Sequence, residues 1–157
     1  MLPWSTTGAS LSLTAVMADM VTDAKAKLLS TASSGKVIAE LTFGFWPNLL
    51  TKRFHSTLWL PSLHKAFPDA TEPRSIIHLR LEVIRRLRNR IAHHEPILTS
   101  HNEVYTGFKD QPYIALSSIL ECVEWVSKDA AAWLKTQSRY QRAEELLLDV
   151  SKKGITL

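Results

Sequence analysis

Apolar residues recur along most of this chain three or four residues apart, which is the spacing of an amphipathic helix. The first run predicts a helix over about residues 10–30, built on Leu11, Leu13, Val16, Met17, Met20, Val21, Ala24 and Leu28. Ser33-Ser34-Gly35 breaks this run, and a second helix is expected over about 36–50, with a kink or an early stop at Pro47. A short helix is expected over about 58–67, ended by Pro68 and Asp69.

The clearest pattern predicts a main helix over about residues 72–93, with Pro73 in its first turn. Its apolar residues fill roughly 200° of a helical wheel, so we expect a central, mostly covered helix. The apolar set is Ile76, Ile77, Leu79, Leu81, Val83, Ile84, Leu87 and Ile91, and the polar stripe is His78, Glu82, Arg85, Arg86, Asn89 and His93. Arg80 falls inside the apolar arc, so it should be ion-paired or lie at an edge. Pro96 disfavours a helical Glu95, so the helix should end near His93 or His94.

The remainder of the chain predicts a loop over 98–111 and three further helices. The first should run from Pro112 or Tyr113 to about Val126, with Ile114, Leu116, Ile119, Leu120, Val123 and Val126 facing inward. Ser127 should cap a helix over 128–136, and Ser138 a last helix over 139–152, with Gly154 as its stop. With no strand-like alternation, no repeat and no glycine-rich phosphate loop, the fold class is all-α. We expect a single helical bundle of about five to six helices spanning 1–157.

Composition places the chain among soluble globular proteins. It has 157 residues, of which 45% are hydrophobic. The single cysteine, Cys122, lies in an apolar run and is interpreted as a small buried hydrophobe rather than a reactive thiol. No apolar run approaches the ~20 residues that span a bilayer, and the first residues do not resemble a secretory signal. We therefore expect a cytoplasmic protein without a membrane partner.

Positive charge is concentrated on the main helix. The net charge is +4, and between Arg74 and His94 six arginines accompany a single acid, Glu82. Such a stripe is typical of a surface that meets a polyanion, although a solvated or ion-paired helix face would carry the same residues. A second, smaller basic cluster begins at Lys52. The candidate RNA-binding residues are Arg85, Arg86, Arg90, Lys52 and Arg53.

The end of the main helix carries the residues most suited to chemistry: Arg88, Asn89, His93 and His94. An imidazole could take the proton of an RNA 2′-hydroxyl or protonate the leaving 5′-oxygen. Arg88 could hold the phosphate and stabilise the charge that develops on it, while Asn89 orients either group. No metal ion or cofactor is required. The products would be a 2′,3′-cyclic phosphate and a 5′-hydroxyl.

Other interpretations of this segment remain open. Arg88 and His93 are about 140° apart on a straight helix, so they meet only if the helix distorts, a substrate bridges them, or a second subunit supplies one of them. Polar and basic residues at a helix C-terminus also cap free carbonyls, which is a purely structural role. A metal site of His93, His94 and Glu95, with His101 nearby, is weaker, because adjacent residues point to different sides of a helix.

Several blocks of the chain together resemble the Abi-like (abortive infection) family of the HEPN superfamily. They are Leu41-Thr42-Phe43-Gly44-Phe45-Trp46, Leu58-Trp59, Ala66-Phe67-Pro68 and Arg85-Arg86-Leu87-Arg88-Asn89-Arg90-Ile91-Ala92-His93-His94-Glu95-Pro96-Ile97. The similarity extends from about Trp4 to Trp133. The family signature, an Arg followed four to six residues later by a His, falls on Arg88, Asn89 and His93, and His94 also fits the spacing.

The resemblance implies a HEPN-like helical bundle, a homodimer with a composite active site, and metal-independent cleavage of RNA. It also implies a role in phage defence of the toxin type, with an antitoxin or another defence protein as a partner. Some members of the superfamily bind without cutting, so a non-catalytic regulatory module is the alternative. Members of the family usually carry further N-terminal helices, which this sequence is expected to lack.

Overall fold

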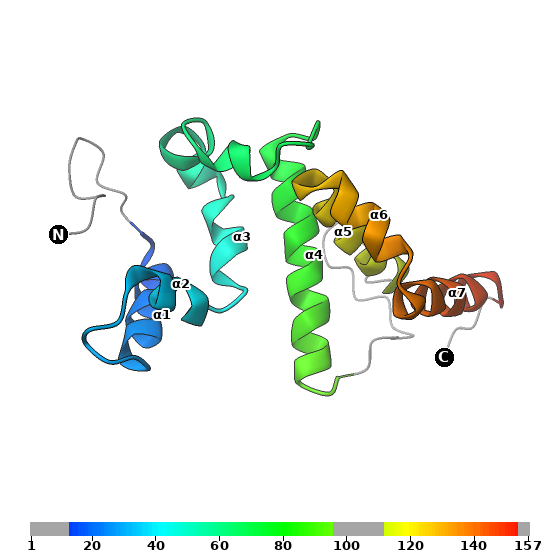
Figure 1. The fold of residues 1–157 in the computed structure, drawn as a ribbon, viewed down its shortest axis with the longest axis horizontal. Helices are drawn as coiled ribbons and strands as arrows, with labels where there is room; N and C mark the ends of the chain where they lie inside the picture. The colour runs from blue at the N-terminus through cyan, green and yellow to red at the C-terminus, as the bar shows by residue number, and fades with distance from the viewer. Residues whose placement is uncertain (1–12, 96–111, 154–157) are drawn as a thin grey trace. The chain divides into compact units, whose positions relative to one another are not determined.

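The structure, a computed structural model, describes residues 13–95 and 112–153 (Figure 1). Every regular element within these ranges is helical, which confirms the all-α prediction. The chain divides into two compact units, Met1–Pro61 and Ser62–Leu157, and each is described by itself. None of the helices in the described ranges combines the length and apolar character needed to cross a bilayer. The expected loop over 98–111 and the stop at Gly154 lie outside the described residues.

The first unit contains α1 (Ala15–Ala26), α2 (Ser34–Glu40) and α3 (Phe45–Leu49). Its core consists of Met17, Phe45 and Phe54. Half-buried aliphatic side chains from α1, from α3 and from the segments that flank the helices pack against it. Thr14 caps α1, because its hydroxyl accepts a hydrogen bond from the Met17 amide at 3.3 Å. The described part of this helix is shorter than the predicted 10–30.

The predicted helix over 36–50 is interrupted, but before Phe45 rather than at Pro47, and the structure has two short helices there. The chain leaves α2 at Leu41, whose ψ of 132° is extended, and becomes helical again at Phe45. Proline lacks an amide hydrogen and its ring clashes with the carbonyl four residues earlier. Breaking the helix before Phe45 puts Pro47 in the first turn of α3, where neither penalty applies. Gly35, expected to be a breaker, instead lies inside α2.

Short helical turns replace the predicted helix over 58–67, which is also wrong. They are η1 (Lys52–Phe54) and η2 (His55–Trp59) in the first unit and η3 (Leu63–Ala66) in the second. Pro61 lies in the middle of the predicted span, and its missing amide hydrogen prevents a continuous helical ladder.

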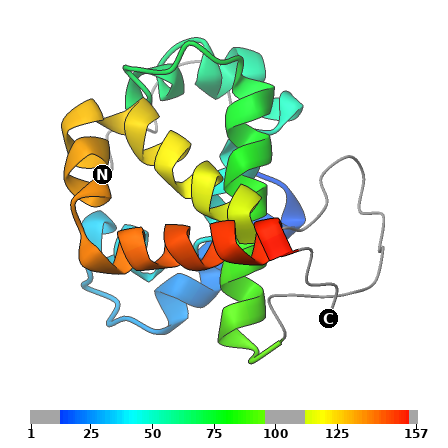
Figure 2. The ribbon, with the colours of Figure 1, turned by 90° about the vertical axis from the view of Figure 1, so that its right-hand side faces the viewer.

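The second unit is built from α4 (Arg74–Ala92), α5 (Pro112–Val126), α6 (Lys128–Lys135) and α7 (Ser138–Lys153). Helix α4 packs along α5, and α5, α6 and α7 form three sides of a rough triangle in Figure 2. Ser127 caps α6 as predicted, accepting a hydrogen bond from the Ala130 amide at 3.2 Å. The main helix begins two residues later than expected, because Pro73 is its extended N-cap rather than part of its first turn.

The buried face of α5 includes small side chains, of which the sequence pattern singled out only Cys122. The buried line on α5 is Ala115, Ser118, Cys122 and Trp125, whereas Val126, expected to face inward, is 52% exposed. Small residues let the two helices approach closely, and the fully buried Ser118 hydroxyl is satisfied by donating to the Ile114 carbonyl at 2.7 Å. Burial raises the pKa of the Cys122 thiol to about 12, which agrees with its interpretation as a buried hydrophobe.

An ion pair joins the same two helices and confirms the expectation for Arg80. Its Nε donates to Glu121 Oε2 at 2.7 Å. The apolar arc of α4 is covered only in part: among the described residues Ile77 is its one fully buried residue, and Ile91 is 53% exposed. In the described part of the chain α4 packs chiefly along α5, so much of its wide apolar arc stays half-buried.

Candidate functional site

The C-terminal end of α4 is closed by a defined hydrogen-bonded turn. The helix ends at Ala92, within a residue of the prediction, and His93 is its C-cap. The His94 amide donates to the Ile91 carbonyl at 3.2 Å, and the Glu95 amide donates to the Arg90 carbonyl at 2.9 Å. These two bonds constitute a Schellman motif, which satisfies carbonyls that the end of a helix would otherwise leave open.

His94 occupies the left-handed position of this motif, with φ of 56°. Glycine usually fills this position, because a Cβ atom there is crowded by the neighbouring carbonyl. Histidine tolerates the conformation better than bulky residues do, but it still retains some strain. Because the backbone turns out of the helix at His94, the side chains of His93 and His94 are not related by the roughly 100° step of a helix.

The four candidate catalytic residues all lie in this last stretch of α4 and its cap. Arg88, His93 and His94 are exposed and Asn89 is half-buried. The Arg88 guanidinium donates from Nη1 to the Asn89 Oδ1 at 3.4 Å, a long bond that leaves most of its donors available. His93 and Asn89 share a helical face, and the His93 amide donates to the Asn89 carbonyl at 2.9 Å.

The structure brings Arg88 and Asn89 into contact, but the helix geometry does not bring Arg88 to His93. His93 is the C-cap, with φ of −96° and ψ of 8°, so regular helical geometry extends only to Ala92 and places position 93 about 140° around the axis from Arg88. Within one chain, the guanidinium and the imidazole therefore approach a common phosphate from different sides of the helix end.

The arginines that were candidates for RNA binding differ in their surroundings. Arg85 is held by Glu82 through bonds of 3.0 Å from Nε and 2.8 Å from Nη2, both to Oε2. This hydrogen bond to Glu82 raises the pKa of Arg85, and it offsets the charge that Arg85 presents to solvent. Arg86 and Arg90 are half-buried. The basic stripe is therefore partly ion-paired, as one of the two sequence interpretations expected.

Lys52 and Arg53 belong to the first unit, in η1, and both are exposed. The Arg53 guanidinium carbon lies 5.9 Å from the centre of the Phe54 ring, a cation–π contact with a residue of that unit's core.

His78, part of the predicted polar stripe but not a site candidate, is a half-buried titratable group on the first half of α4. Burial lowers its pKa, Glu82 one turn along raises it, and Arg74 one turn before lowers it. In the sequence, His78 stands on the polar stripe one turn from Arg74 and one turn from Glu82. A helical wheel shows this position but does not show whether the imidazole is half-buried or fully solvated.

No cluster of three metal-ligating side chains is found within residues 13–95 and 112–153. His93, His94 and Glu95 are successive exposed residues around the cap, and His101 lies outside the described residues. Comparison of the chain with protein-family models, with curated proteins and with solved structures finds no match.

Proposed function

We propose that this protein is a metal-independent endoribonuclease of the abortive-infection type that acts as a cytoplasmic homodimer. The observation that carries this function is the contact of the exposed Arg88 with the half-buried Asn89, beside two exposed imidazoles at the end of one helix. Arg88 binds the scissile phosphate through donors that Asn89 does not occupy. An imidazole removes the proton from the 2′-hydroxyl or protonates the 5′-oxygen as it leaves.

Two features support a composite site made by two copies of the chain. The guanidinium and His93 face different sides of α4, so a second copy that contributes its own helix end can complete each site. The exposed Ile91 lies between these residues in the sequence, and it offers apolar surface for a partner at the same helix end. Each of the two sites would then use Arg88 of one protomer and an imidazole of the other.

Cleavage of single-stranded RNA in the presence of a chelator tests the activity. Wild type should give products with 2′,3′-cyclic phosphate ends, and Arg88→Ala or His93→Ala should lose at least ~100-fold in rate. Arg142→Ala is a matched control, because Arg142 is exposed on α7 and its ion pair is with Glu145. Cleavage that survives both active-site substitutions in folded protein would contradict the proposed function.

Mixing the two inactive variants tests the composite site. Random pairing makes half of the dimers mixed, and each mixed dimer holds one intact Arg88 and one intact His93 in the same site. Activity should therefore return to about one quarter of the wild-type value. A site formed within one chain predicts no recovery.

A non-catalytic RNA-binding or protein-binding module in phage defence is the second candidate. The complete Schellman motif favours it, because the segment from Arg90 to Glu95 then has a structural role in ending α4. This candidate predicts RNA binding that weakens steeply with salt, without turnover, in a protein whose partner could be an antitoxin. Cyclic phosphate ends that depend on Arg88 would exclude it.

A further inference from the structure

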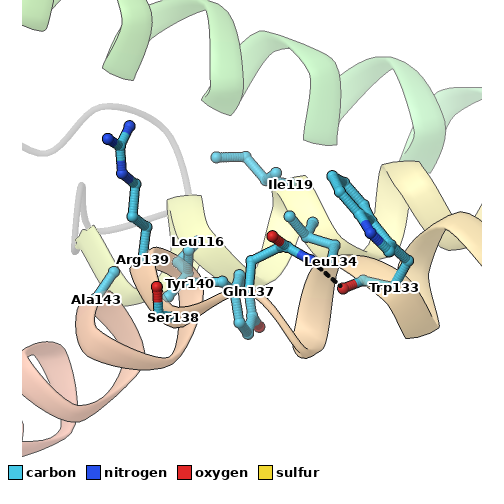
Figure 3. Close-up of a pocket in the computed structure, with 9 residues that line it drawn as sticks. All are labelled: Leu116, Ile119, Trp133, Leu134, Gln137, Ser138, Arg139, Tyr140 and Ala143. Atoms are coloured by element: carbon cyan, nitrogen blue, oxygen red, sulfur yellow. Dashed lines mark hydrogen bonds between the residues drawn. The ribbon is translucent and has the colours of Figure 1, made fainter.

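A groove in the second unit is lined by residues other than those of the motif at the end of α4. Helices α5, α6 and α7 enclose a groove of about 480 Å³ (Figure 3). Its walls are mostly aliphatic and aromatic, comprising Leu116, Ile119, Trp133, Leu134, Tyr140 and Ala143. All the lining residues belong to this one unit.

The Trp133 side chain is the most unusual part of this groove, because it is 63% exposed. A large indole left in water beside aliphatic side chains is typical of a surface that another molecule covers. Figure 3 shows Trp133 at one end of the groove, with Leu134 and Ile119 between it and Arg139.

The turn that carries Trp133 is held firmly. The Trp133 carbonyl accepts hydrogen bonds from the Thr136 hydroxyl at 2.7 Å, the Thr136 amide at 3.0 Å and the Gln137 Nε2 at 3.3 Å. Gln141 Nε2 also donates to the Lys135 carbonyl, which joins α7 to the end of α6. These bonds fix the backbone that carries Trp133, and an aromatic side chain has few rotatable bonds to immobilise on binding, which favours its use as an anchor.

Arg139 determines the charge that the groove accepts. Among the described residues that line it, Arg139 alone carries a formal charge. It is exposed, and no ion pair of its guanidinium is found within the described ranges. A ligand that fits must therefore be mainly aliphatic and must bring an anionic group to this end.

We infer that this groove binds an amphipathic helix of a partner protein, with aliphatic side chains between Trp133 and Arg139 and a carboxylate paired with Arg139. A helix fits better than single-stranded RNA, because RNA binding uses several cations along a backbone and stacked aromatic rings. The groove offers one cation, one exposed ring and a row of aliphatic side chains, which is the pattern of helix-in-groove recognition.

A displayed library of amphipathic helices about 16 residues long, selected on the wild-type protein, tests this inference. Enriched sequences should carry aliphatic residues at i, i+3 or i+4, and i+7, together with Asp or Glu on the same face. Trp133→Ala should weaken a selected peptide at least ~10-fold. Arg139→Glu should weaken it similarly and reverse the preference toward a matched peptide with Lys in place of the acid.

The experiment also includes matched control variants and tests of other ligands for the groove. Lys135→Glu reverses an exposed charge on α6 outside the groove, and Leu146→Ala removes exposed apolar surface on α7, so neither should change peptide affinity. Peptides without an acidic consensus, or affinity unchanged by Trp133→Ala, would overturn the inference. So would self-association of the protein, or binding of an oligouridylate, that Trp133→Ala abolishes. RNA cleavage should be unaffected by both groove substitutions, so this test is independent of the proposed ribonuclease.

Discussion

His94→Gly should stabilise the protein although it removes a side chain. The left-handed conformation costs an ordinary residue about 1–2 kcal/mol, and glycine adopts it freely. Glycine also makes the unfolded chain more flexible, which costs about 0.4–1 kcal/mol in stability. Because His94 has φ of 56° and is exposed, the strain relief should exceed this cost by about 0.5 kcal/mol.

The adjacent histidine supplies a matched control. His93→Gly changes the unfolded chain in the same way, but His93 has φ of −96°, so there is no left-handed strain to relieve. The difference in unfolding free energy between the two glycine variants therefore isolates the strain at His94, about 1–2 kcal/mol. Urea titrations should show it as a midpoint difference of roughly 0.5–1 M at equal m-values. Equal loss of stability in both variants would refute the strained cap.

The same pair of variants separates the structural and chemical roles of the two imidazoles. If His93 is the acting group, His94→Gly keeps RNA cleavage while raising stability, and His93→Gly abolishes cleavage. The opposite pattern would assign the chemistry to His94, with its strain as part of the site. If both variants still cleave RNA, the two histidines have only a structural role in ending α4.

Three further predictions concern the second unit. Cys122, with a pKa of about 12, should resist iodoacetamide in the native protein at pH 8 and react only after unfolding; rapid native labelling would contradict its burial. Burial lowers the pKa of His78 in the folded state, so the unfolded chain takes up its proton first and stability should fall as pH drops below about 6.5. His78→Gln should remove that part of the pH dependence in urea titrations at pH 5 and pH 7, and an unchanged dependence would refute the assignment. A double-mutant cycle with Arg80→Met and Glu121→Gln should give a coupling free energy of about 0.5–1 kcal/mol. The value is small because both side chains are partly exposed and solvent screens their charges. A coupling free energy of zero would show that the pair is not formed in solution.

The helices of the second unit were largely predictable because their signals are local. The end of α4, the span of α5 and the Ser127 cap of α6 each follow from residues within one or two turns. The differences over 36–50 and 58–67 are local as well: the first helix breaks before Phe45 rather than at Pro47, and the missing amide hydrogen of Pro61 interrupts the second.

The candidate site was likewise predictable from the sequence only in part. That a polar, basic, imidazole-rich segment lies at the end of a helix was evident from the sequence, because Pro96 and the wheel define both the end and the faces. That His94 adopts a left-handed conformation was not evident, since no glycine marks the position and the turn depends on how the last carbonyls are satisfied.

The sequence alone therefore determined the helical class, most helix positions in the second unit and the residues available for chemistry, because spacing, caps and prolines act over a few residues. Only the tertiary structure decided which charges and faces remain available. Arg80 is neutralised by a glutamate 41 residues away, and Trp133 is exposed because of how α5, α6 and α7 meet. Burial and ion pairing depend on neighbours that are distant in the chain, and a pattern of single positions does not contain them.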